Sequence, residues 1–159
     1  MKTLFTVFFL SFTTMIIAQD RLPSVQLDNL NGRTVSIQDI SKDQLVVVSL
    51  WATWCVPCIK ELEAINDVYS KWQEETGVEL YAVSVDDART VKRVRPMVMG
   101  KGWDYHVLLD TNHRFKRAVG ASAVPMLLVV KNNKILYRRN GYAPGSEEEL
   151  YQKLLEFSK

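Results

Sequence analysis

The chain has 159 residues, of which 47% are hydrophobic and 24% are charged, a composition typical of a folded domain. Its formal net charge is +2, with both signs mixed along the sequence, so charge gives no support for a nucleic-acid partner. No internal repeat or low-complexity tract is present, and the glycines and prolines fall at turns. We therefore expect one compact domain without a linker.

The first eighteen residues have the pattern of a secretion signal. Lys2 supplies a positive charge, residues 4–17 carry none, and Ala18 is a small residue suited to cleavage. The apolar run is shorter than the roughly 20 residues that cross a bilayer, although the bulk of Ile16 near the cut leaves an uncleaved anchor as the alternative. We predict a signal peptide at 1–18 and an exported, periplasmic domain at 19–159, with no stable membrane span once the signal is cleaved.

Three strands are expected before the first long helix. Two short ones, at residues 24–27 and 33–37, flank a turn that contains Asn31-Gly32, a strong hairpin signal. Residues 45–51 are almost continuously apolar, which is typical of a central strand covered on both faces. Ser49 is the polar exception, and we interpret it as a hydroxyl bonded to nearby backbone.

The only two cysteines, Cys55 and Cys58, follow this strand where it gives way to a helix. Two thiols separated by two residues can close into a disulfide and reopen with little movement of the backbone. Cys55 is expected at the helix N-terminus, where free N–H groups and the helix dipole favour a thiolate. Lowering a thiol pKa from about 8.5 to about 7 corresponds to roughly 2 kcal/mol. We therefore predict a redox-active pair in which Cys55 is the attacking sulfur.

A helix is predicted over residues 56–75, because its apolar and charged side chains separate onto two faces at 100° per residue. The apolar face comprises Leu62, Ile65, Val68, Tyr69 and Trp72. Glu61 falls on this apolar face, one turn beyond Cys58. Removal from water raises the pKa of a carboxyl group, so we predict that Glu61 carries a proton beside the cysteines. The alternative is that its side chain bends out to solvent.

Residues 78–120 are predicted to alternate between strands and helices. The expected elements are a strand at 78–85, a helix at 88–99, a strand at 105–109 and a brief helix from 110 to Gly120. Asp86 and Asp87 could serve as an acid-base pair, but their position favours capping the second helix. Pro96 is expected to kink that helix.

His106 and His113 invite comparison with a zinc site formed with the two cysteines. Their spacing from each other and from Cys58 differs from the compact spacings of structural zinc sites. We therefore predict no metal and no other cofactor.

The last segment is predicted to be a hairpin followed by a helix. Val124-Pro125 precedes an apolar strand at 126–130, which turns through Asn132-Asn133 into a second strand at 134–139. Pro125 could mark a strand edge, but we favour a cis peptide that faces the cysteines. Ser146 and Glu149 have the spacing of a capping box for the closing helix.

With Trp54-Cys55-Val-Pro57-Cys58 after a buried strand and Val124-Pro125 before a hairpin, the chain resembles the thioredoxin superfamily over residues of about 24 to 157. More narrowly, it is similar to the TlpA/ResA-like group of exported thiol-disulfide oxidoreductases. The resemblance implies an α/β, thioredoxin-like fold: a central mixed sheet flanked by helices, with an N-terminal β-hairpin and a central αβ insertion at about 88–110.

The resemblance also implies roles for the residues around the cysteines. Thioredoxins proper carry a buried Asp where this chain has Ser49, which cannot titrate, so the proton-handling role passes to Glu61. Trp54, Pro57, Val124 and Pro125 are expected to support the site. Met126, where many relatives have Thr, and Val-Pro between the cysteines, where thioredoxin has Gly-Pro, leave partner choice and redox potential open.

The function expected from this resemblance is reduction of protein disulfides outside the cytoplasm through a mixed disulfide. Protein disulfides are the expected substrates, apocytochrome c among them, and an upstream thiol donor is the expected electron source. One alternative is a redox-inert binding module in which Cys55 and Cys58 form a structural disulfide. Another is a peroxiredoxin-like peroxidase, but Val48 and Ala52 replace the Pro and Thr of its P-x-x-x-T-x-x-C motif.

Overall fold

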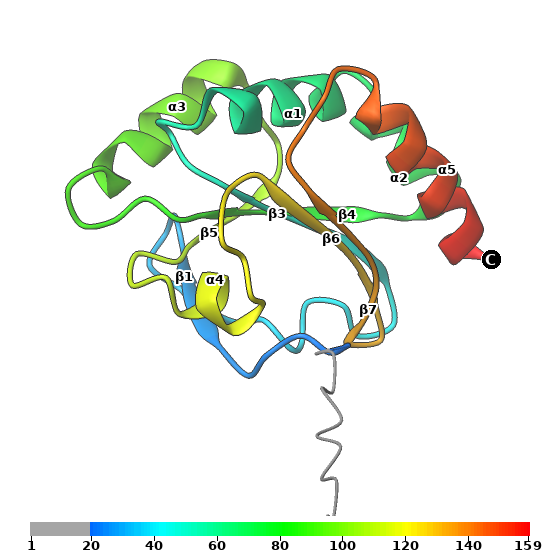
Figure 1. Ribbon diagram of the computed structural model, residues 1–159, viewed down its shortest axis with the longest axis horizontal. Helices are drawn as coiled ribbons and strands as arrows, with labels where there is room; N and C mark the ends of the chain where they lie inside the picture. The colour runs from blue at the N-terminus through cyan, green and yellow to red at the C-terminus, as the bar shows by residue number, and fades with distance from the viewer. Residues whose placement is uncertain (1–19) are drawn as a thin grey trace, which may run out of the picture.

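The computed structural model describes residues 20–159, which form a seven-stranded mixed sheet and its covering helices (Figure 1). The predicted signal peptide at 1–18 lies outside the described residues. The strands are β1 (Gln26–Asn29), β2 (Thr34–Ser36), β3 (Leu45–Trp51), β4 (Glu79–Ser84), β5 (His106–Leu109), β6 (Met126–Lys131) and β7 (Lys134–Asn140). The helices are α1 (Val56–Asn66), α2 (Tyr69–Thr76), α3 (Val94–Lys101), α4 (Arg114–Ala118) and α5 (Ser146–Ser158), with a short 3-10 turn η1 (Val91–Arg93) before α3.

The sheet has the order β2-β1-β5-β4-β3-β6-β7. Strand β3 is central, pairs in parallel with β4 and antiparallel with β6, and is buried along all of its residues, as its apolar run predicts. The N-terminal hairpin β1–β2 extends the sheet beyond β5. The segment between β4 and β6 contributes α3 and β5, so the predicted hairpin and αβ insertion are both confirmed.

Helices cover both faces of this sheet. Figure 1 shows α1, α2, α3 and α5 on one side and α4 on the other. The stacking of Trp72 in α2 on Tyr151 in α5, with ring centroids 6.0 Å apart, joins two helices of the larger layer. Within residues 20–159, no helix combines the length and the apolar character that crossing a membrane requires.

The predicted helix at 56–75 is two helices. α1 ends at Asn66, and Val68 leaves helical geometry with a φ of −121° before α2 begins. Asn and Asp are weak helix formers because their side chains compete for backbone hydrogen bonds, and Asn66-Asp67 stands at this break. The predicted apolar face survives the break, since Leu62, Ile65, Tyr69 and Trp72 are all buried.

The predictions for α3 and α5 also need correction. Pro96 is the third residue of α3, where a helix needs no N–H donor from it, so it lies in the first turn instead of kinking a longer helix. Ser146 is not a capping residue of α5: Gly145 occupies that position, and the Ser146 hydroxyl donates to the carbonyl of Ala143 at 2.6 Å.

Candidate active site

Cys55 and Cys58 form a disulfide at the N-terminus of α1, with their Cα atoms 5.3 Å apart. Cys55 is the capping residue of the helix, in extended backbone geometry, and its Sγ accepts a hydrogen bond from the Cys58 N–H at 3.3 Å. Pro57 lies in the first turn, where the absence of its N–H costs nothing. The sequence thus places the Cys55 sulfur where backbone N–H groups can stabilise negative charge.

The two sulfurs differ in their access to a partner. Cys55 is 5% exposed, whereas Cys58 is fully buried. Trp54 and Val56, on either side of Cys55, are 56% and 61% exposed, an unusual position for large apolar side chains. Cys55 and the two exposed apolar side chains beside it are therefore more accessible from outside than Cys58 is.

The Val124–Pro125 peptide bond is cis, as predicted. Met126, the next residue, pairs with Leu50 one position before the end of β3, so Pro125 lies at the same end of the sheet as the cysteine turn. The Pro125 carbonyl accepts a hydrogen bond from the Gly141 N–H at 2.8 Å, which ties this loop to the end of β7.

Asp86 holds the turn that precedes the cysteines, and this corrects its predicted capping role. Its fully buried carboxylate accepts hydrogen bonds from the Thr53 N–H at 2.9 Å, the Thr53 hydroxyl at 2.6 Å and the Ser84 hydroxyl at 2.8 Å. Asp87 instead closes a local turn through the Arg89 N–H. Asp86 thereby fixes the end of β4 to the residue two places before Cys55.

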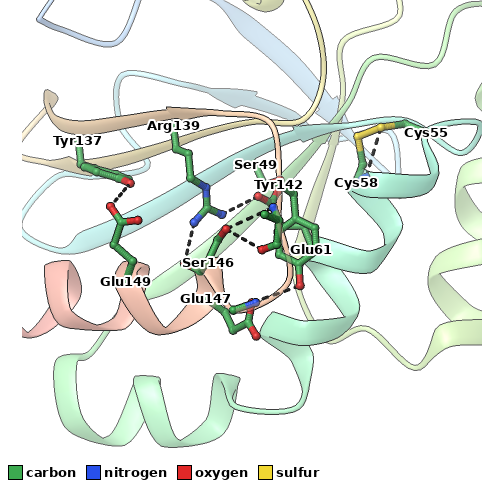
Figure 2. Close-up of polar contacts among 12 residues, drawn as sticks. Ser49, Cys55, Cys58, Glu61, Tyr137, Arg139, Tyr142, Ser146, Glu147 and Glu149 are labelled. Atoms are coloured by element: carbon green, nitrogen blue, oxygen red, sulfur yellow. Dashed lines mark hydrogen bonds and ion pairs between the residues drawn. A yellow bond between two sulfur atoms is a disulfide. The ribbon is translucent and has the colours of Figure 1, made fainter.

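Glu61 is fully buried on α1, so the predicted burial is confirmed and the alternative of a solvent-directed side chain is wrong. Its Oε2 accepts a hydrogen bond from the Ser49 hydroxyl at 2.9 Å, and its Oε1 lies 2.7 Å from Nη2 of Arg139 (Figure 2). The prediction for Ser49 is therefore wrong in its partner, since the hydroxyl bonds to a carboxylate instead of to backbone.

The sheet register explains how these side chains meet. Ser49 pairs with Leu127 on β6, and Leu127 pairs with Arg139 on β7. Directly paired residues point to the same face of a sheet, so Ser49 and Arg139 both reach the face that α1 covers. The side chain of Glu61 extends from α1 toward this face of the sheet and contacts both Ser49 and Arg139.

Burial raises the pKa of Glu61, and this effect outweighs the opposing hydrogen bond and charge of Arg139 and the hydrogen bond from Ser49. The result is a carboxyl group that is a stronger base than an exposed Glu, yet one with a cation beside it. Such a group holds its proton to a higher pH than an exposed carboxyl group does.

The histidines do not lie together with the cysteines. His106 contacts Glu79 at 3.1 Å where β4 and β5 begin, and Nε2 of His113 lies 2.8 Å from the Val85 carbonyl. Among residues 20–159 there is no cluster of three or more His, Cys, Asp or Glu side chains suited to a metal ion.

Arg139 and Asp86 are the site residues that the sequence interpretation missed. Arg139 has no local signal, because only the pairing of β7 with β6 brings it to Glu61. Asp86 carried one possible signal: it lies two residues after the end of β4, a strand parallel to β3, and the carboxyl ends of parallel strands meet at one edge of a sheet.

Comparisons with known proteins agree with this geometry. The profile of the AhpC/TSA family matches residues 18–139. The thiol-disulfide oxidoreductase ResA of Bacillus anthracis is 29% identical over 152 residues, which cover 95% of this chain and 85% of that protein.

Two solved structures are similar over most of their length. The solution structure of an uncharacterized thioredoxin-like protein from Porphyromonas gingivalis is 44% identical, with a TM-score of 0.77, and the match covers 89% of this chain and 92% of that one. The crystal structure of StoA from Bacillus subtilis, at 19% identity and a TM-score of 0.65, shares the fold over 82% of this chain and 99% of its own. The chain therefore belongs to the AhpC/TSA family, in which it is a thiol-disulfide oxidoreductase of thioredoxin-like fold with a Cys-x-x-Cys pair.

Proposed function

We propose that this protein reduces disulfide bonds of proteins outside the cytoplasm through the dithiol form of Cys55 and Cys58. The observation that carries this proposal is the asymmetry of the pair: Cys55 caps α1 and is the more exposed sulfur, while Cys58 is buried one turn deeper. An attacking sulfur must reach a partner, and a resolving sulfur needs only to reach the attacking one.

In the first step, the Cys55 thiolate attacks one sulfur of the partner's disulfide. A bond forms between Cys55 Sγ and that sulfur, the partner's own S–S bond breaks, and the second partner sulfur leaves as a thiolate that takes up a proton. The exposed side chains of Trp54 and Val56 supply apolar contacts for the partner, and the loop at Pro125 lies at the same end of the sheet.

In the second step, Cys58 attacks Cys55 and displaces the partner. The Cys55–Cys58 disulfide forms, the mixed disulfide breaks, and the partner leaves with both electrons as a dithiol. Cys58 must lose its proton first, and Glu61 is the base we assign to it, because residues three apart on a helix are neighbours and its pKa is raised by burial. An upstream thiol donor then restores the dithiol.

The direction of electron flow depends on the reduction potential. Known enzymes of this chemistry span about −270 to −120 mV, and strong oxidants stabilise the reduced form. Val56-Pro57 places no histidine between the cysteines to stabilise a Cys55 thiolate further. We therefore expect a reducing protein, and a measured potential near −120 mV would contradict this direction.

The location and the substrates are part of the proposal. The pattern of residues 1–18 supports export to the periplasm, and mass spectrometry of the secreted protein should find an N-terminus at Gln19. Apocytochrome c, with its C-x-x-C-H cysteine pairs, is one substrate class, and misoxidised exported proteins are the other.

A trapping experiment tests the proposed function. Cys58→Ser cannot resolve the mixed disulfide, so partners should remain bound to Cys55 and be released by dithiothreitol. The matched control is Cys55→Ser, which keeps one thiol but loses the attacking one. If both variants trap the same proteins in equal amounts, or if the unaltered protein fails to reduce insulin, the disulfide is structural and the proposal is wrong.

A further inference from the structure

The side chain of Arg139 makes polar contacts with Glu61 and Ser146 that packing against the sheet alone would not require. It is 12% exposed and forms an ion pair with a Glu61 side chain that is 1% exposed. Its Nη1 also donates to the carbonyl of Ser146 at 2.7 Å, at the start of α5. Arg139 thus connects β7, α1 and α5 around one buried carboxyl group (Figure 2).

The hydrogen bonds of the Arg139 side chain do not satisfy all of its buried polar atoms. Its Nε has no hydrogen-bond partner among the described residues although it is buried. Buried polar groups without partners are rare in folded proteins, and an apolar side chain at this point of the sheet would avoid the penalty. A cation at this position therefore indicates a need for charge beside Glu61.

The other groups around Glu61 do not supply that charge. Ser49, on β3, does not titrate, and Cys58, on α1, is neutral or negative. Tyr142 faces Glu61 from the loop before α5, but its hydroxyl donates to Glu147 at 3.2 Å. Burial, followed by the charge of Glu147, raises the pKa of Tyr142 above its ordinary value of 10.0, so it stays neutral in the working range.

We infer that Arg139 is a positioning residue for the thiol chemistry: its guanidinium stabilises the ionised form of the buried Glu61 carboxyl group and thereby sets the pH range in which Glu61 can take the proton from Cys58. This inference rests on the proposed role of Glu61. Without the cation, burial is opposed only by the hydrogen bond from Ser49, so the pKa of Glu61 rises further and the carboxyl group keeps its proton to a higher pH than in the unaltered protein.

The test measures the second step by itself, as a function of pH. Reduced protein is mixed with dithionitrobenzoate in a stopped-flow instrument. Attack by Cys55 releases the first thionitrobenzoate at a rate proportional to the reagent concentration, and intramolecular resolution by Cys58 releases the second. The phase at 412 nm whose rate does not depend on the reagent concentration therefore reports resolution. In the unaltered protein, its rate should fall at acidic pH, where Glu61 is protonated.

Arg139→Gln is the main variant, because it retains an N–H donor at this position but removes the charge. We expect the acidic limb of the rate profile to move up by about 1–3 pH units, the range by which a nearby opposite charge displaces a carboxyl titration. Arg139→Lys should restore the original limb. Arg138→Gln is the matched control: it removes a charge from the adjacent residue of β7, whose Nη1 binds the Val119 carbonyl, and should leave the profile unchanged.

The outcomes separate this inference from the proposed function. If Glu61→Gln abolishes the acidic limb while Arg139→Gln leaves it in place, the inference is wrong and the role of Glu61 stands. If Glu61→Gln changes nothing, both are wrong. Should Arg139→Gln fail to fold, ¹³C NMR of the unaltered protein decides, since a Glu61 carboxyl that is still protonated at pH 8 overturns the inference and an ionised one supports it.

Discussion

Replacing Asp86 by Ala should strongly destabilise the protein. The substitution removes the acceptor of three buried hydrogen bonds, two from Thr53 and one from Ser84. A buried donor left without a partner costs about 1–3 kcal/mol. The Thr53 N–H cannot rotate to another acceptor and should incur most of this penalty, whereas the two hydroxyls can reorient. We therefore expect the free energy of unfolding to fall by about 4 kcal/mol.

Urea unfolding of the oxidised protein, followed by tryptophan fluorescence, measures this loss. For a domain of this size it corresponds to a decrease in Tm of about 8–16 °C. Asp86→Asn retains one acceptor oxygen and should lose about half as much. Asp87→Ala is the matched control, because the neighbouring carboxylate is bound only by exposed groups such as Arg89.

The expected order of stability is therefore Asp87→Ala above Asp86→Asn above Asp86→Ala. A loss below about 1 kcal/mol for Asp86→Ala, or one equal to that of Asp87→Ala, would show that Asp86 does not hold the turn before Cys55.

Three further predictions concern the cysteine end of the sheet. The pKa of Glu61 in the folded protein is raised above its ordinary value of 4.5, so the unaltered protein should lose stability relative to Glu61→Gln as the pH rises from about 4.5 through that folded pKa. The loss should amount to up to about 1.4 kcal/mol per pH unit. Urea titrations between pH 5 and pH 8 measure this slope, and a slope of opposite sign would refute the raised pKa. Reduction of the Cys55–Cys58 disulfide, which closes a very short loop, should lower the unfolding free energy by no more than about 2 kcal/mol in urea, and a much larger loss would favour a structural disulfide. Trp54→Ala, at a 56% exposed side chain, should leave Tm nearly unchanged but slow insulin reduction, and an unaltered rate would show that Trp54 does not contact the partner.

Local patterns in the sequence were sufficient for the central strand, for the disulfide and for the burial of Glu61. The apolar run of residues 45–51 predicts the central strand because a strand buried on both faces needs apolar side chains at every position. The spacing of Cys55 and Cys58 at a strand-to-helix junction predicts the disulfide. The angular position of Glu61 on α1 predicts its burial, because a helix with a clear apolar face has only one side to turn toward a sheet.

Predictions that depended on a choice among local hydrogen bonds were less successful. Asp86 was expected to cap the next helix and Ser49 to bond to nearby backbone, since both residue types bind neighbouring backbone groups readily. Each instead bonds to a side chain distant in sequence, Asp86 to Thr53 and Ser49 to Glu61. A polar side chain selects the partner that the fold brings within reach, and its own sequence neighbourhood does not record that partner.

The sequence by itself therefore determined the order of the elements, the cysteine pair and the presence of a buried carboxyl group one turn beyond it. Only the tertiary structure decided what surrounds that carboxyl group. Arg139 lies 78 positions from Glu61, and it reaches it because β7 pairs with β6 and β6 with β3 in one particular register. A shift of one residue in that register would turn Arg139 to the opposite face of the sheet, so the charge beside Glu61 is a property of strand pairing that no local pattern encodes.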